Sequence, residues 1–275
     1  MRRSSEAAAG GGAFVSRAGR RWLTLSTGLT FLFLYFPIVV LIVYSFNESR
    51  VFTFPPSGFS LKWYGVLLDD QDMHTSILNS LIVAAGAVPL SLLLGTAAAF
   101  ALDRFRFPGR RQFERLLLMP LMIPGLITGL AILLVMKRMG FSLSLGTVII
   151  GHSIAWIPVV VTQVYARLRR FDRSYEEASM DLGGNRRQTF FRVTLPNIRT
   201  AIIGSALLVF ALSFDEIAIT FFLTGADNTL PMHIWSMMRE GITPEIAAIA
   251  TVTVTLSVVL ILAGVRLSSS STDSD

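Results

Sequence analysis

Apolar runs of twenty or more residues constrain the fold of this chain more than any other feature. A helix crosses about 30 Å of hydrocarbon with about 20 residues, because it rises about 1.5 Å per residue. Lipid offers backbone amides no partner, so each spanning segment must pair its own backbone groups. The sequence therefore predicts an all-α membrane protein with six transmembrane helices. Their approximate ranges are Trp22 to Phe46, Ile77 to Leu102, Leu116 to Met136, Leu145 to Tyr165, Ile198 to Phe222 and Ile246 to Val265.

Charged residues are scarce. With 52% hydrophobic residues, 15% charged residues and a mean hydropathy of +0.60, the chain has too little polar surface for an ordinary soluble globule. A net charge of +6 could indicate nucleic acid binding, but the arginines flank apolar runs and do not form a stripe with aromatic residues. We therefore predict lipid, and not nucleic acid, as the surroundings of this chain.

The arginines predict how the chain is oriented, because cytoplasmic loops carry an excess of basic residues. They gather before the first run, after the second and after the fourth, at Arg2, Arg3, Arg17, Arg20, Arg21, Arg104, Arg106, Arg110, Arg111, Arg167, Arg169, Arg170, Arg173, Arg186 and Arg187. Both termini are then cytoplasmic. The first run is longer than a signal-peptide core, so it is interpreted as a retained anchor. The expected organisation is a disordered basic N-terminus over residues 1–21, a six-span domain over 22–267 and a disordered tail over 268–275.

The polar run SYEEASMDLGGNRRQTFFRVTLP, Ser174 to Pro196, interrupts the apolar pattern. Ser174 and Glu177 have capping-box spacing, and Gly183-Gly184 is a helix stop. Asn185 and Gln188 indicate a second helix start, and Leu195-Pro196 closes the unit. Residues 174–196 are thus predicted to form two short helices that project into the cytoplasm. An amphipathic loop on anionic lipid is the alternative, but the acids Glu176, Glu177 and Asp181 favour a docking element.

Several strings within this chain resemble one family. Glu177-Ala178-Ser179, then Asp181-Leu182-Gly183 and Leu195-Pro196, resemble the EAA coupling motif of bacterial ABC importer permeases, with serine in place of the motif's third residue, alanine. Other strings resemble the spermidine/putrescine (PotC/PotI-type) permeases, and the resemblance runs from about Tyr35 to about Arg266. These strings are Tyr44-Ser45-Phe46-Asn47, Leu61-Lys62-Trp63-Tyr64, Tyr165-Ala166-Arg167-Leu168 and Ser213-Phe214-Asp215-Glu216.

The resemblance implies a type I (MetI-like) ABC importer permease in the bacterial inner membrane. The implied partners are an ABC ATPase dimer, a second permease in a heterodimer and an extracytoplasmic binding protein. ATP and Mg would belong to the ATPase, and this chain would have no cofactor. The implied ATPase-coupling residues are Glu177, Ala178, Ser179, Asp181, Gly183, Leu195 and Pro196.

A substrate path is expected near Ser213, Asp215 and Glu216. About 17 residues of helix from Ile198 reach ~26 Å into the bilayer, so the carboxylates lie toward its outer side. Carboxylates there are costly unless they face a cavity, water or a cation, and a polyamine is such a cation. Alternatively, the pair marks a helix end at the outer interface, or pairs with a basic group such as Lys137 or Arg138. Trp63 and Tyr64 could stack on substrate or anchor the outer interface.

The third run departs from the polyamine pattern. Polyamine permeases of this type commonly have an acid where this chain has Gly125. Pro120, Pro124, Gly125 and Gly129 still predict a kinked helix beside a cavity, or a kink that serves packing alone. Other small solutes, such as opines, amino-acid derivatives or phosphonates, therefore remain alternative substrates.

Nothing in the sequence indicates an enzyme. It has no phosphate-binding glycine-lysine loop, no nucleophile with a base and, with no cysteine and three scattered histidines, no metal cluster or metal site. A secondary transporter and a membrane-bound sensor are the other classes considered. The first lacks the internal repeat that its class often shows, and the second would not need acids along a path.

Overall fold

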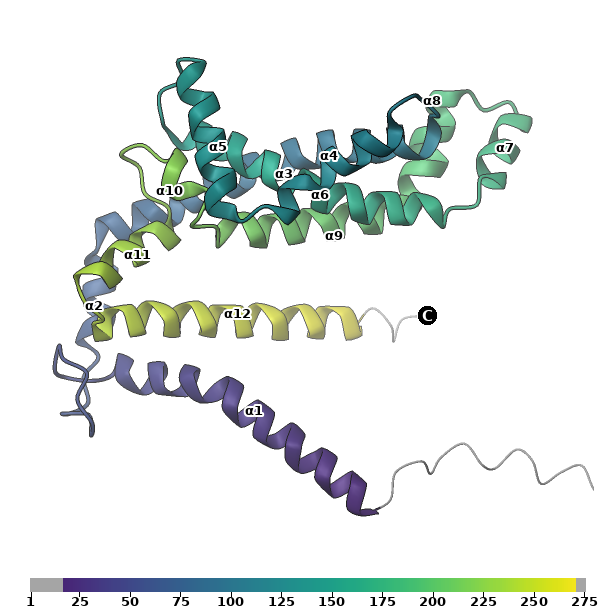
Figure 1. The fold of residues 1–275 in the computed structure, drawn as a ribbon. Coiled ribbons are helices and arrows are strands. Elements are labelled where there is room, and N and C mark those ends of the chain that lie inside the picture. The colour runs from purple at the N-terminus through teal and green to yellow at the C-terminus, as the bar shows by residue number, and fades with distance from the viewer. Residues whose placement is uncertain (1–16, 271–275) are drawn as a thin grey trace, which may run out of the picture. The chain divides into compact units, whose positions relative to one another are not determined.

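The computed structural model describes residues 17–270, and these are almost entirely helical (Figure 1). They form two compact units, which divide at Asp69/Asp70 and at Arg239/Glu240. The first unit contains α1 (Arg17–Ser45), α2 (Lys62–Asp69) and α12 (Pro244–Ser270). The second contains α3 (Gln71–Arg104), α4 (Arg110–Met122), α5 (Gly125–Arg138), α6 (Leu145–Arg169), α7 (Ser174–Asp181), α8 (Arg186–Thr189), the π-helical turn η1 (Phe190–Thr194), α9 (Leu195–Phe214), α10 (Thr220–Leu223) and α11 (Leu230–Glu240).

In the first unit, α12 contacts α1 and α2. The apolar side chains along α1 are mostly exposed, as Phe33 shows with an exposed fraction of 79%. An exposed apolar helix of this length is suited to lipid and unsuited to water. The loop after α1 is closed by a backbone bridge between Asn47 and Phe59.

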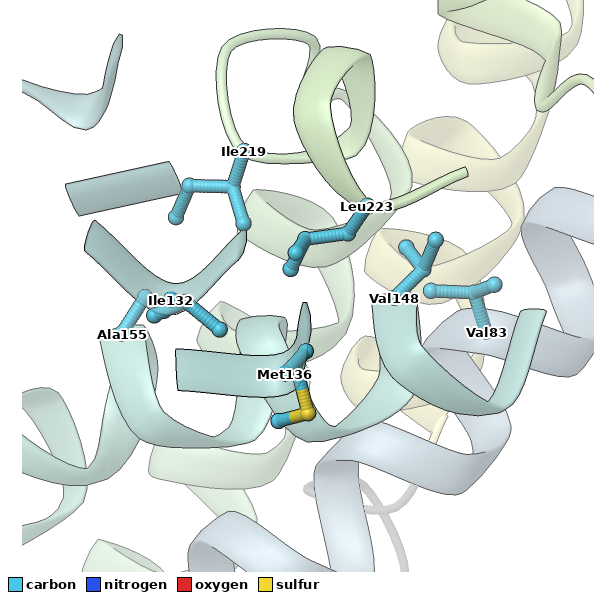
Figure 2. Close-up of a cluster of buried hydrophobic side chains, with 7 residues drawn as sticks. All are labelled: Val83, Ile132, Met136, Val148, Ala155, Ile219 and Leu223. Carbon is cyan, nitrogen blue, oxygen red and sulfur yellow. The ribbon is translucent and has the colours of Figure 1, made fainter. Parts of the chain in front are cut away.

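The second unit is a bundle in which α3, α6 and α9 contact one another. Its core consists of two apolar clusters, and α3 and α6 contribute to both. Figure 2 shows the first, which consists of Val83, Ile132, Met136, Val148, Ala155, Ile219 and Leu223. The second consists of Ala99, Val159, Val160, Val164, Leu168, Ile198 and Val209.

Small residues let α3 and α6 approach closely. A Cβ atom built at Gly95 of α3 would lie 2.6 Å from the Cβ atom of Val160 on α6. A Cβ atom at Gly86 would lie 2.8 Å from Cδ1 of Ile149. Close approach through small residues is the usual way in which membrane helices gain packing contacts, because lipid supplies no hydrophobic force between them.

The all-α fold class is confirmed, whereas the count of six spans remains a prediction. Within residues 17–270, four helices are long and apolar enough to cross a membrane: Gly19–Ser45, Gln71–Arg104, Leu145–Arg169 and the continuous stretch Arg186–Phe214. The pair α4 and α5 could provide a fifth span. The part of α12 whose side chains the structure describes, Pro244–Thr255, is apolar but shorter than a span.

The third predicted span, Leu116 to Met136, is broken where a kinked continuous helix was predicted. α4 ends at Met122, and α5 begins at Gly125 at an angle of 113° to it. Ile123 between them is extended, with φ −92° and ψ 131°. A residue before proline is driven out of the helical region, and Pro124 imposes this on Ile123. Pro120 lies inside α4 and does not end it.

The predicted domain limits differ from the observed helices at both ends. α1 begins at Arg17, inside the segment predicted to be disordered, and α12 continues to Ser270. The rest of the two predicted disordered segments, residues 1–16 and 271–275, lies outside the described residues.

Candidate coupling and transport sites

A glycine bend joins α7 to α8 at one end of the second unit (Figure 1). Gly183 has φ +87°, a left-handed conformation that glycine adopts without strain. The Gly183 amide donates to the Met180 carbonyl at 2.9 Å, and the Gly184 amide donates to the Ser179 carbonyl at 2.9 Å. This pair of bonds is the Schellman arrangement that satisfies the last carbonyls of a helix. The predicted helix stop at Gly183-Gly184 is therefore confirmed.

The start of α7 differs from the prediction. α7 begins at Ser174, but no side-chain capping bond forms there, so the predicted box of Ser174 with Glu177 is wrong. Instead, the Ser174 amide donates to Asp172 Oδ1 at 3.0 Å. This backbone hydrogen bond, with a further bond from the Ser174 side chain, lowers the pKa of Asp172. The Asp172 carboxylate thus accepts from the first amide of α7, whereas the Glu177 amide, the donor in the predicted box, bonds to the Arg173 carbonyl.

The start of α8 is as predicted, but its end is not. Asn185 and Gln188 form a capping box, with both reciprocal bonds at 2.9 Å. Leu195-Pro196, however, does not close the helix, which continues through η1 into α9. Proline has no amide to donate, and the wider π turn just before Pro196 makes room for its ring within a continuous helix.

Glu176, which the sequence reasoning did not assign to coupling, ties α7 to the bundle. Its Oε1 accepts a hydrogen bond from Arg104 Nη2 at 2.6 Å, and Thr194 Oγ1 in η1 donates to the same oxygen. Nearby, Arg173 Nη2 lies 3.1 Å from Asp103 Oδ2 at the end of α3. Charge-assisted bonds of this kind are the stronger ones, especially when half-buried. A displacement of α7 would therefore act directly on α3 and on η1, which continues into α9.

The predicted coupling residues Glu177, Ala178, Asp181 and Gly183 are exposed. Ser179 is half-buried, and its hydroxyl lies 3.0 Å from that of Thr189. Apolar side chains beside them are also exposed, as Leu182 shows with a fraction of 90%. A hollow of about 550 Å³ lies between α7 and the start of the α8–η1 helix, with Ala178, Gly183 and Gln188 in its lining. These features give α7 and α8 a free, shaped surface suited to docking.

The acidic segment follows α9, which ends at Phe214, eight residues before the predicted end at Phe222. Asp215 caps this end and is exposed, whereas Glu216 is half-buried. The Ile219 amide donates to Glu216 Oε1 at 2.9 Å. A side-chain acceptor just after α9 thus supports a short non-helical turn before α10. α9 thus ends just before the pair, and both carboxylates lie at a break in the helix.

Ser213 differs from Asp215 and Glu216 in its solvent exposure. It is buried, and its Oγ lies 2.8 Å from Nδ1 of His152 on α6. The alternative pairing with Lys137 or Arg138 is not observed, since in the described part of the chain neither Asp215 nor Glu216 forms an ion pair.

Gly125 lies beside this acidic segment. A Cβ atom at Gly125 would lie 3.8 Å from Glu216 Oε1 and 3.1 Å from the Ala218 Cβ atom. Pro124 breaks the α4–α5 pair at the same point. The family resemblance leads one to expect an acid at position 125. Gly125 is thus adjacent to a carboxylate from elsewhere in the chain, that of Glu216.

Trp63 and Tyr64 belong to the first unit, where both side chains make local contacts. Trp63 is buried, and its Nε1 donates to the Asn47 carbonyl at 2.7 Å. The Tyr64 hydroxyl lies 2.7 Å from Ser45 Oγ. These contacts secure the loop after α1, and a role in substrate contact remains a prediction. Within residues 17–270, no group of three or more His, Cys, Asp or Glu residues could hold a metal ion.

The helical membrane fold and the projecting α7–α8 element define the class of this protein, a transport permease. Residues 87–271 match the family described as the binding-protein-dependent transport system inner membrane component, and the chain belongs to this family. It is therefore an integral membrane subunit of an ABC importer and is not an enzyme. This membership excludes the secondary transporter and the sensor considered from the sequence.

Two relatives from Escherichia coli (strain K12) are similar over most of their length. The putrescine transport system permease protein PotI is 40% identical over 238 residues, which cover 84% of each chain. The spermidine/putrescine transport system permease protein PotC is 34% identical over 232 residues, which cover 84% of this chain and 88% of the relative. The predicted PotC/PotI-type family is thus confirmed.

A solved structure supports the fold. A bacterial ABC transporter involved in the import of the acidic polysaccharide alginate has a chain that superimposes with a TM-score of 0.70. The identity is 20%, and the match covers 93% of this chain and 99% of that one. The predicted type I importer architecture is therefore confirmed at the level of the fold.

Proposed function

We propose that this chain is a permease subunit of an ATP-driven importer of polyamines, with putrescine or spermidine as the substrate. The observation that carries this proposal is the 40% identity to a putrescine permease over 84% of both chains. The carboxylates of Asp215 and Glu216, which form no ion pair within residues 17–270, agree with it, because a polyamine is a cation that could neutralise them.

The proposed partners follow from the family and from the exposed surface of α7 and α8. An ABC ATPase dimer, which binds ATP and Mg, docks on the exposed Glu177 and on Ala178 and Gly183, which line the hollow of this element. A second permease pairs with this chain as a heterodimer, and an extracytoplasmic binding protein delivers the substrate. Closure of the ATPases moves α7, and the bonds of Glu176 transmit this movement to α3 and α9 as rigid bodies.

The proposed substrate path includes Asp215 and Glu216 at the break between α9 and α10, with Ser213 behind them. A role for Trp63 and Tyr64 in substrate contact is a separate proposal for the first unit. The third-span acid is absent at Gly125, so Glu216 supplies the carboxylate at that point.

The proposed topology places both termini and α7–α8 in the cytoplasm and the loop after α1 outside the inner membrane. The chain has no native cysteine, so single cysteines report cleanly. We expect Ser57→Cys to react with a membrane-impermeant thiol reagent added outside. Ser174→Cys, also at an exposed position, should react only after the membrane is opened. Labelling of these two variants from the opposite sides would contradict the topology.

Uptake by the complete transporter tests the function. The chain is to be expressed with its partner subunits in cells that lack polyamine uptake, and radiolabelled putrescine and spermidine are to be supplied. We expect saturable, ATP-dependent uptake of at least one polyamine and copurification of the ATPase with this chain. Uptake of an opine, an amino-acid derivative or a phosphonate, without any polyamine uptake, would overturn the substrate and leave the importer class intact.

A further inference from the structure

One buried imidazole links the two ends of the acidic segment. His152 of α6 is fully buried, with Nδ1 2.8 Å from Ser213 Oγ and Nε2 2.9 Å from Thr220 Oγ1. Ser213 lies in the last turn of α9, and Thr220 is the first residue of α10. The two bonds therefore bracket Asp215 and Glu216 from both sides.

The hydrogen bonds of Thr220 determine which tautomer this network requires. The Thr220 hydroxyl donates its single proton to the Glu216 carbonyl at 3.0 Å. It must therefore accept a hydrogen bond from His152 Nε2–H, which leaves Nδ1 to accept from the Ser213 hydroxyl. Both ring nitrogens of the neutral imidazole are then satisfied within the protein. His152 has no nitrogen left for a metal or a substrate, so it acts through the groups that it holds.

The bracketed segment needs such support. Helical bonding ends at Phe214 and resumes at Thr220, and the turn between them relies on the Glu216 side chain bonding to the Ile219 amide. Fixing the backbone of each residue in such a turn costs conformational entropy. Buried hydrogen bonds to a ring on another helix restrict the turn at both ends.

We propose that His152 is a positioning residue for the transport site: by binding Ser213 and Thr220, it holds Asp215 and Glu216 in the orientation that receives a cationic substrate. This inference rests on the transport role proposed for the two carboxylates. A purely structural histidine would stabilise the bundle as a whole, whereas a positioning histidine controls this segment in particular. The two roles differ in what happens to the acidic segment when the bonds of His152 to Thr220 or to Ser213 are removed.

Thr220→Val removes the hydroxyl and keeps the shape, and Thr220→Ser, the matched control, keeps the hydroxyl. Each is to be combined with Glu216→Cys in the full chain, and the rate of reaction with a charged thiol reagent is to be measured. We expect Thr220→Val, which loses the bonds of this hydroxyl to His152 and to the Glu216 carbonyl, to react roughly two- to tenfold faster through local opening. Thr220→Ser should react at the unchanged rate. Ser57→Cys serves as a reporter in the first unit. Its rate of reaction with the reagent should be the same whether position 220 carries threonine or valine.

Transport provides the second measurement, with both carboxylates present. In Thr220→Val, we expect the maximal uptake rate to fall roughly two- to tenfold, while the binding-protein concentration for half-maximal uptake stays constant. Thr220→Ser should keep the wild-type rate. His152→Ala should show the same change in both measurements, although it keeps the Thr220 hydroxyl and its bond to the Glu216 carbonyl. If that variant does not fold, Ser213→Ala, which removes the other bond to the ring, replaces it in the labelling measurement.

The proposal would be overturned if Glu216→Cys were labelled at the same rate in Thr220→Val and in Thr220→Ser. It would also be overturned if Thr220→Val raised the labelling rate of Ser57→Cys as much as that of Glu216→Cys. The proposed function fails differently. If the wild-type transporter takes up no polyamine while Thr220→Val still labels faster at position 216, the substrate assignment is overturned and the positioning by His152 is supported.

Discussion

Gly183→Val is expected to reduce transport by about tenfold or more while the chain still inserts into the membrane. Gly183 has φ +87°, and a non-glycine residue in that region costs on the order of 1–3 kcal/mol. A change of about 1.4 kcal/mol shifts an equilibrium tenfold. The valine would unwind the bend and displace the surface proposed to meet the ATPase. Copurification of the ATPase and uptake of substrate are the two measurements.

Two further variants separate strain from loss of contact. Gly140 has φ +79° and open space around it, so Gly140→Val imposes a similar strain outside α7 and α8. It should leave ATPase copurification unchanged. Asparagine tolerates left-handed backbone better than valine, so Gly183→Asn should preserve the bend and still weaken docking through its side chain. Normal ATPase association and uptake in Gly183→Val would contradict a coupling role for this bend.

Local signals in the sequence predicted the coupling element well. The stop at Gly183 and the capping box of Asn185 with Gln188 depend on residues three to five positions apart, which a sequence displays directly. The error at Ser174 arose from the same local rules, because Asp172 two residues earlier is an equally good acceptor. The all-helical fold followed from the length of the apolar runs alone.

Contacts between distant segments could not be predicted in this way. Arg104 and Glu176 are 72 positions apart, and His152 and Thr220 are 68 apart. Glu176 and Glu177 look alike in the sequence, but consecutive residues on a helix point about 100° apart. One carboxylate therefore reaches α3, and the other faces outward. The buried position of His152 gave no signal either, because its partners Ser213 and Thr220 are ordinary residues for an apolar helix.

Neutralising both acids, Asp215→Asn with Glu216→Gln, is expected to lower polyamine uptake by about tenfold or more. Two ammonium–carboxylate attractions would be lost, and such attractions are stronger beside a low-dielectric wall than in bulk water. In Glu216→Gln the new side chain still presents a carbonyl oxygen to the Ile219 amide, so the turn itself should persist. Uptake by the assembled transporter and substrate binding to the isolated receptor are to be measured together, and only uptake should fall.

Asp227→Asn is the matched control, because Asp227 is an exposed acid in the loop after α10. It removes one charge from the loop that follows the acidic segment and should leave uptake nearly unchanged. Unaltered uptake in the double variant would remove the pair from the path.

The single variants then assign the effect to one of the two acids. A larger loss in Glu216→Gln than in Asp215→Asn would locate the cation beside Gly125, where the half-buried carboxylate faces the break between α4 and α5. A larger loss in Asp215→Asn would locate it at the exposed end of α9.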